Sequence, residues 1–370
     1  MSQTPRTTRT RWIVALAAAV ALVGGTIAVT TNAVATTPLP PLSAQELLTK
    51  VAAVEVDGMS GTVEQTSNLG LPQLPSGMGG QDLGSALALL TGTHTFRVWT
   101  SGTDKARVAL VDGPTETAVI ANGTSIWMWS SADQKATHRV VDADEHDAST
   151  PMPAGTPATP AEMVKQLLEK ASPTTEFTTS GTATVAGRSV YELVATPKDD
   201  AALVRDVRVS IDSETFVPLA VTVTGTADEP AISVAFTSVD FSVPDASIFT
   251  FTPPPGAKVT EATPGAELPD SPTTPASEKP VIVGESWTTV VVATMPSKGV
   301  DVPDAEADET EGSVTDQLAP LLSRLPRVSG DWGAGRLFST TLINVVITDD
   351  GRVAAGSVEP QLLYQALAGR

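Results

Sequence analysis

The residue types that perform covalent or metal chemistry are scarce in this chain of 370 residues. It contains no Cys and three His, at His94, His138 and His146. The absence of Cys excludes disulfides, thiolate metal sites and a cysteine nucleophile. His138 and His146 lack a third nitrogen ligand for a zinc site. No Gly-x-Ser-x-Gly motif and no Gly-rich phosphate loop occur, so the sequence predicts that the protein is not an enzyme and needs no cofactor or metal.

Carboxylates are abundant, but they gather in loops. The acidic run Asp142–Asp147 could hold a divalent cation through its carboxylate oxygens. We interpret it instead as a solvated loop, because charge runs of this kind are usually exposed. The chain has 23 Lys plus Arg against 42 Asp plus Glu, and its formal net charge is −19. That balance argues against nucleic acid as a partner, because binding to phosphates needs a concentrated basic surface.

The N-terminal residues 1–35 have the pattern of an export signal. Three arginines precede the uncharged apolar run Trp12–Val29, and the small residues Ala33-Val34-Ala35 follow it. The run is also just long enough for an uncleaved membrane anchor. Whether this segment is cleaved or stays as an anchor, the sequence predicts that the protein is exported. It would then lie in the extracytoplasmic cell envelope or be secreted.

Residues 36–260 alternate between short strands and turns. Ser43-Ala44-Gln45-Glu46 is a capping-box pattern and predicts an amphipathic helix over residues 44–55. A second helix is expected to begin at Thr159-Pro160. The hairpin-like spacing of the strands favours an antiparallel meander. Strands are expected at Met59–Thr66, Thr93–Ser101, Lys105–Val111, Thr115–Asn122, Ser125–Ser130, Ala136–Asp142, Thr174–Val185, Ser189–Thr196, Leu203–Asp212, Phe216–Thr224 and Ala231–Ser242.

The C-terminal third of the chain is set apart by a linker. Residues 261–280 are rich in Pro, Thr and acids. Residues 281–370 are expected to form a small α+β extension. Its expected elements are a strand over Val281–Met295, a helix over Val314–Leu325, a hairpin formed by Arg336–Asp349 and Arg352–Val358, and a closing helix over Pro360–Ala368.

An ordered set of short motifs carries a family resemblance. These are Gly61–Thr66, Asn122–Trp129, Gly187–Leu193, Pro197-Lys198, Ile211-Asp212, Pro218-Leu219 and the ending Phe249–Val259. In this order they resemble the LolA-like lipoprotein carriers, their actinobacterial relatives and the RseB-like envelope-stress sensors, over residues 43–260. The resemblance implies a curved, half-open antiparallel β-barrel of about eleven strands, with lid helices at its mouth and acyl chains on its concave face. The chain departs from the carriers in an insertion at residues 68–92 and in the added residues 261–370.

The resemblance and the strand pattern together suggest a hydrophobic cavity. Trp127 and Trp129 are two residues apart, so they face the same side of a strand. We expect them to line the cavity, and packing as ordinary core is the alternative. The expected cavity residues are Phe96, Val98, Trp99, Ile126, Trp127, Met128 and Trp129.

Lid or flap residues are expected on three segments. Two are the helices, and the third is the nearly uncharged insertion Leu69–Leu90, whose Leu83, Leu87 and Leu90 keep helical spacing. A flexible loop at the barrel rim is the alternative for the insertion. The expected lid residues are Leu47, Leu48, Val51, Leu83, Leu87, Leu90, Met163 and Leu167.

Two functions follow as hypotheses. The first is non-covalent binding and carrying of lipid acyl chains or lipoproteins in the cavity. The second is a regulatory sensor that binds the extracytoplasmic part of a membrane signalling protein, with residues 261–370 as its partner-binding part.

Overall fold

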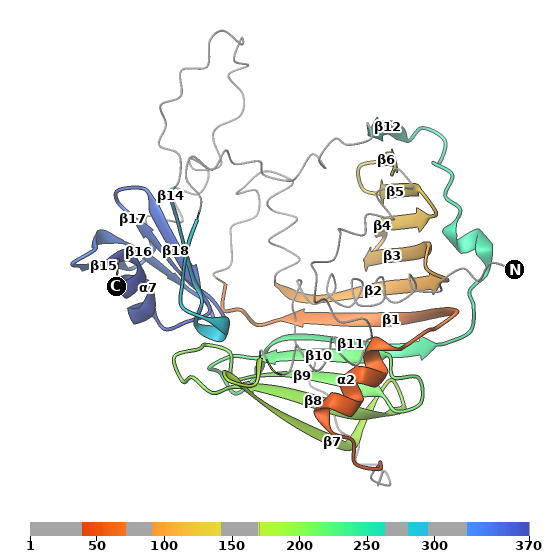
Figure 1. Ribbon diagram of the computed structural model, residues 1–370. Coiled ribbons are helices and arrows are strands. Elements are labelled where there is room, and N and C mark those ends of the chain that lie inside the picture. Colours follow the sequence, from red (N-terminus) through yellow and green to blue (C-terminus); the bar gives the residue numbers. More distant parts are fainter. Residues whose placement is uncertain are drawn as a thin grey trace, which may run out of the picture.

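The computed structural model describes residues 39–71, 91–141, 169, 171–262, 280–294 and 324–369. These residues form a 12-stranded sheet and a 6-stranded sheet (Figure 1). The strands of the large sheet are β1 (Gly58–Ser67), β2 (Gly92–Ser101), β3 (Lys105–Asp112), β4 (Thr115–Asn122), β5 (Ser125–Ser130), β6 (Lys135–Val140), β7 (Thr175–Val185), β8 (Arg188–Pro197), β9 (Asp206–Asp212), β10 (Pro218–Thr224), β11 (Pro230–Asp240) and β12 (Lys258–Ala262).

The large sheet is open, with β12 at one edge and β7 at the other. Its order is β12-β6-β5-β4-β3-β2-β1-β11-β10-β9-β8-β7. Neighbouring strands are antiparallel, except that β12 runs parallel to β6. Figure 1 shows this sheet curving from β12 at the top of the view to β7 at the bottom. The predicted curved, half-open and mainly β architecture is therefore confirmed, and β12 is the one strand of this sheet that the sequence did not indicate.

Local sequence explains the hairpins of the sheet. Asn122-Gly123 joins β4 to β5, and Gly123 has φ 60°, a left-handed conformation that glycine adopts without strain. A second glycine serves close packing. A Cβ on Gly61 in β1 would lie 2.7 Å from the ring of Phe236 in β11, so only glycine lets this ring lie over the strand.

The helix α2 (Ala44–Ala52) begins where the capping box predicted. Ser43 Oγ accepts from the backbone N–H of Glu46 at 3.2 Å, and the Glu46 carboxylate accepts from the Ser43 N–H at 2.9 Å. Leu47 on its inner side is fully buried against Tyr191 and Leu193 of β8. The helix is thus fixed to one face of the β7–β9 part of the sheet. The second predicted helix lies outside the described residues.

The 6-stranded sheet forms the C-terminal body at the left of Figure 1. Its order is β13-β14-β18-β17-β16-β15, and α7 (Pro360–Leu367) covers one face. The closing helix over residues 360–368 is thereby confirmed. The strand expected over Val281–Met295 is divided in two, because Gly284 turns the chain with φ 84°. The strands of this sheet are β13 (Val281–Val283), β14 (Val290–Thr294), β15 (Arg327–Gly330), β16 (Gly333–Ser339), β17 (Asn344–Thr348) and β18 (Arg352–Gly356). Two short 3-10 helices are η1 (Ala246–Phe249), which precedes β12 of the large sheet, and η2 (Ser286–Thr288), which precedes β14.

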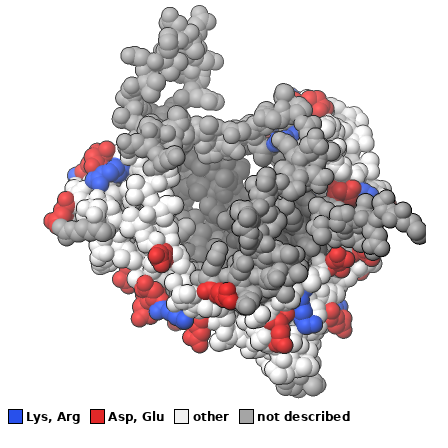
Figure 2. Space-filling model, viewed as in Figure 1, with Lys and Arg blue, Asp and Glu red and all other residues white. Residues whose placement is uncertain are grey.

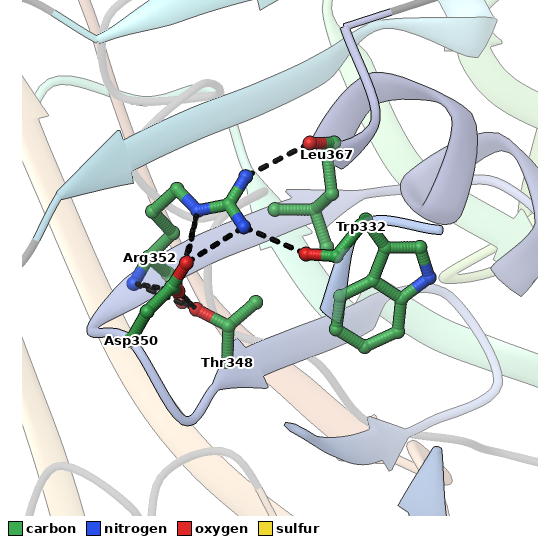
Figure 3. A network of polar contacts seen from close by, with 5 residues as sticks. All are labelled: Trp332, Thr348, Asp350, Arg352 and Leu367. Carbon is green, nitrogen blue, oxygen red and sulfur yellow. Dashed lines mark hydrogen bonds and ion pairs between the residues drawn. The ribbon is translucent and has the colours of Figure 1, made fainter. Parts of the chain in front are cut away.

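A polar network built around Arg352 holds α7 on this sheet (Figure 3). Its guanidinium donates to the carbonyl oxygens of Leu367 and Trp332, both at 2.8 Å, and pairs with Asp350. Asp350 also accepts from the Thr348 hydroxyl. The hydrogen bond from Arg352 lowers the pKa of Asp350 to about 2. One side chain therefore ties the C-terminal end of the helix to two hairpins.

Replacing Arg352 should loosen α7 without unfolding the large sheet. We expect Arg352→Ala to lower the stability of the C-terminal body by about 2–3 kcal/mol, because two carbonyl groups lose charged donors at a partly buried site. Arg352→Lys should recover part of this, since one ammonium cannot reach all the partners of a planar guanidinium. Hydrogen exchange of the α7 amides measures the effect. Unchanged protection in Arg352→Ala would contradict this role.

The two sheets dock through backbone contacts at one end of the large sheet. Ala202 and Val358 form an isolated antiparallel bridge. The Thr341 N–H donates to the Leu69 carbonyl at 3.0 Å. A Cβ on Gly225, after β10, would lie 2.5 Å from the Thr341 carbonyl oxygen, so glycine permits this approach. The sequence predicted a strand from Leu203, whereas β9 begins at Asp206 because the preceding residues bond to the C-terminal body.

Candidate functional site

A cavity of about 320 Å³ lies on one face of the large sheet. We call this the cavity face and define it by Val98, Val108 and Val119 on β2, β3 and β4. The volume is at the lower end of the range for small-molecule pockets, about 300–1,000 Å³. The wall is almost wholly apolar, and Asp104 and Lys105 at the β2–β3 turn are its charged residues. Further apolar wall residues are Val56, Met59, Val63, Ala106, Ala121, Ile126, Val217, Leu219, Val221, Val234 and Phe236.

Cross-strand rows build the wall. Val98 faces Val108, Val108 faces Val119, and Val119 faces Met128 across four adjacent strands. Directly opposite residues share a face of the sheet, so these side chains form one continuous apolar row. Val119 is 46% exposed although it is a large apolar residue of a central strand. Such exposure in a concave wall marks a surface suited to an apolar ligand.

The helix α2 stands on the same face, beside the cavity. Val221 of the cavity wall pairs with Val209, and Val209 packs against the buried cluster that contains Leu47. The expected lid residues Leu47, Leu48 and Val51 thus hold α2 on β8 and β9. Lid movement of this helix stays a prediction. The other expected lid residues, Leu83, Leu87, Leu90, Met163 and Leu167, lie outside the described residues.

The expected cavity residues divide between the two faces. Val98 and Ile126 lie in the wall, and Phe96 packs beside Val98 in the same cluster. Met128 is directly opposite Val119, on the cavity face. The tryptophans are placed differently, because Trp99, Trp127 and Trp129 alternate with these residues along β2 and β5. The three tryptophans therefore lie on the face opposite to the cavity, and not on the cavity face where they were expected from the sequence.

The tryptophans form a separate small core on the opposite face, which we call the outer face. Trp127 stacks on His138 with ring centroids 4.2 Å apart, and its centroid lies 5.3 Å from that of Phe251. Phe251 belongs to the segment that leads from β11 to β12. Arg107 supports this core, because it lies over the Trp99 ring and donates to the Ile248 carbonyl at 3.3 Å. The tryptophan rings therefore pack against other residues of the same chain.

A buried ion pair fixes the hairpin of β8 and β9. Asp212 is fully buried and accepts from Arg188, from the Thr215 hydroxyl and from backbone N–H groups of the following turn. Burial raises the pKa of Asp212, but the hydrogen bonds from Arg188 and Thr215 more than offset it, so the pKa lies below its ordinary value. The pair thereby secures Val190 and Ile211, which belong to the apolar clusters beside the cavity.

Several solved structures show a low similarity to this chain. The Pseudomonas aeruginosa MucA/MucB complex matches with a TM-score of 0.42 and 13% identity, over 87% of this chain and 96% of that chain. A LolA superfamily protein from Nitrosomonas europaea matches with a TM-score of 0.23 and 10% identity, over 57% of this chain and 99% of that chain.

A further similar structure is an uncharacterised conserved protein from Thermus thermophilus, with a TM-score of 0.35, 10% identity and coverage of 60% of this chain and all of that chain (100%). No family model matches the sequence, and no curated protein matches it. These likenesses concern the fold.

The surface of the described residues is mostly acidic. Figure 2 shows more acidic than basic side chains on the described part of this face, as the net charge of −19 implies. Among the described residues, no group of three or more His, Cys, Asp or Glu could hold a metal ion. No helix among them is long and apolar enough to span a membrane.

Several wall residues were missing from the sequence prediction. Met59, Val63, Leu219, Val221 and Phe236 come from β1, β10 and β11, which meet at the centre of the large sheet. The pairing of β1 with β11 is between distant segments of the chain and has no local sequence signal. Val98 and Trp99 are neighbours on β2 and therefore lie on opposite faces of the sheet. A preference for the smaller apolar residues over the tryptophans would have identified the face of Val98 as the cavity wall.

Proposed function

We propose that this protein binds the acyl chains of a lipid or a lipoprotein non-covalently and carries them outside the cytoplasm. The observation that supports the proposal is the apolar cavity, with the exposed Val119 in its wall. Burial of an acyl chain there would contribute about 0.8 kcal/mol per CH₂ group. The N-terminal pattern supports export, and the apolar wall supports binding rather than catalysis.

Titration with a fluorescent fatty acid tests this proposal. We expect saturable binding, displaced by unlabelled lipid, with one probe bound per chain. A folded protein that shows no saturable binding would contradict the proposal. Circular dichroism of the same sample establishes that the fold is intact.

A second function is supported by a different observation. The edge strand β13 exposes Val281 to 59% and Ile282 to 67%. Exposed apolar edge strands can pair with an added strand of another chain. A regulatory sensor could bind the extracytoplasmic part of a membrane signalling protein in this way. A photo-crosslinker at Ile282 that captures a membrane protein in cells would support this function, and capture of none would count against it.

A further inference from the structure

The apolar cavity face ends in a row of positive charges. Lys135 and Arg139 on β6 and Lys258 on β12 form what we call the cationic edge. Arg139 is directly opposite Ile126, a cavity wall residue, and Lys258 is directly opposite Lys135. Because opposite residues share a face, all three cations stand on the cavity face.

The cationic edge continues directly from the cavity wall. One row of opposite residues runs through Thr100, Ala106, Ala121 and Ile126 and then reaches Arg139. The first four line the cavity. Neighbouring strands are about 4.8 Å apart, so Arg139 is one strand beyond the wall. An amphiphile with its chain in the cavity could therefore reach the edge with its polar end.

The cations of this edge have no partner among the described residues. Arg139 is half-buried, and its Nε is buried without a hydrogen-bond acceptor. Lys135 and Lys258 lie opposite one another, and like charges so placed destabilise a sheet. Neither side chain makes an ion pair with a described residue. In contrast, Arg107, Arg188 and Arg352 each pair with a carboxylate.

Among the described residues, two acids close to the edge in the sequence, Asp133 and Glu261, bond to other groups. Asp133 accepts from the Ser130 hydroxyl at 2.7 Å. Glu261 bonds to His138 Nδ1 at 2.8 Å on the outer face. In a chain with a net charge of −19, these three cations have no acidic partner among the described residues, and the buried Nε of Arg139 can still take an anionic acceptor.

We propose that the ligand of the cavity is an anionic amphiphile whose phosphate headgroup lies on the cationic edge. This inference rests on the proposed acyl-chain binding and adds the class of lipid. Arg139 supplies a planar donor for phosphate oxygens, and Lys135 and Lys258 supply point charges. Thr137 and Thr260, which lie opposite one another between these cations, add hydroxyl groups to the edge.

Competition between two lipids that differ only in the phosphate tests the inference. Decanoyl lysophosphatidic acid and decanoylglycerol, whose single short chain suits a cavity of about 320 Å³, are offered together in equal amounts, and native mass spectrometry of the whole protein gives the ratio bound. We expect the lysophosphatidic acid to be preferred about tenfold, as charged hydrogen bonds would give. Arg139→Gln and the double variant Lys135→Gln with Lys258→Gln should each reduce the preference to less than about threefold. Arg97→Gln, exposed on the outer face, is the matched control and should keep it.

The outcomes separate this inference from the proposed function. Equal uptake of both lipids by the unaltered protein would overturn the phosphate site but leave acyl-chain binding in place. Uptake of neither lipid would overturn both. A preference that survives in both edge variants would overturn the assignment to these residues. Addition of inorganic phosphate alone should leave lipid uptake unchanged, and strong competition by it would indicate a site for free anions instead. Lys135 and Lys258 are exposed, so their variant keeps the test valid if Arg139→Gln fails to fold.

Discussion

Replacement of Val119 by Glu is expected to lower the affinity for an acyl chain at least tenfold. Val119 stands in the middle of the apolar row of the cavity wall and is 46% exposed. Its exposure lets a carboxylate reach water in the empty protein, so the fold should tolerate the substitution. A bound acyl chain would remove that water, and burial of an unpaired charge costs several kcal/mol. Titration with the fluorescent fatty acid measures the change.

Val140→Glu is the matched control for this experiment. Val140 is 43% exposed and is also on a strand of the large sheet, but it lies opposite Ser125 on the outer face. The two variants therefore differ in the face that receives the charge and hardly in exposure. We expect Val140→Glu to bind within about twofold of the unaltered protein. Equal losses in both variants would show that the charge acts on the sheet as a whole and would contradict a binding role for the cavity face.

Removal of the Asp212 carboxylate is expected to have the largest effect on stability. Asp212→Ala should lower the free energy of unfolding by about 3 kcal/mol, because Arg188 and the turn after β9 lose a buried acceptor. Glu214→Ala is the control, since Glu214 pairs with the same arginine but its side chain is 79% exposed. We expect that exposed pair to contribute less than about 1 kcal/mol. Urea unfolding of both variants gives the comparison.

Because of the Asp212 carboxylate, we expect the free energy of unfolding to depend on pH in the acid range. The pKa of Asp212 is lowered in the folded protein, whereas an unfolded Asp titrates near about 3.9. The stabilisation is therefore complete above about pH 4 and is lost as the pH falls through the lower folded value. The difference in stability between the unaltered protein and Asp212→Asn should narrow as the pH is lowered below about 4. A difference that stays constant over that range would show that the charge of Asp212 is not what stabilises the hairpin.

Much of the fold follows from local sequence. Period-2 alternation located the strands of the large sheet, and the capping box at Ser43 located α2. Both signals depend on residues close together in the chain. The strand β12 gave no such signal, because it is held by parallel pairing with β6, more than a hundred positions away in the chain. Divisions such as the one at Gly284 depend on a single backbone conformation and are also invisible to hydrophobic periodicity.

The site was harder to predict than the fold. Strand alternation identified two faces on β5, with Ile126 and Met128 on one and the two tryptophans on the other. It could not say which face is hollow, since that depends on what covers each one. The segment carrying Phe249 and Phe251 covers the tryptophans and makes their face a packed core. Size and aromatic character favoured the wrong side, whereas the hollow is lined by smaller valines and alanines.

Native mass spectrometry of the protein, purified gently from a host that exports it to the envelope, tests the central claim most directly. We expect a mass excess that matches a lipid and that disappears on denaturation. Val119→Glu should lack this excess, and Val140→Glu should retain it. A bare mass for the folded protein, unchanged after incubation with mixed envelope lipids, would contradict the claim that the cavity binds acyl chains.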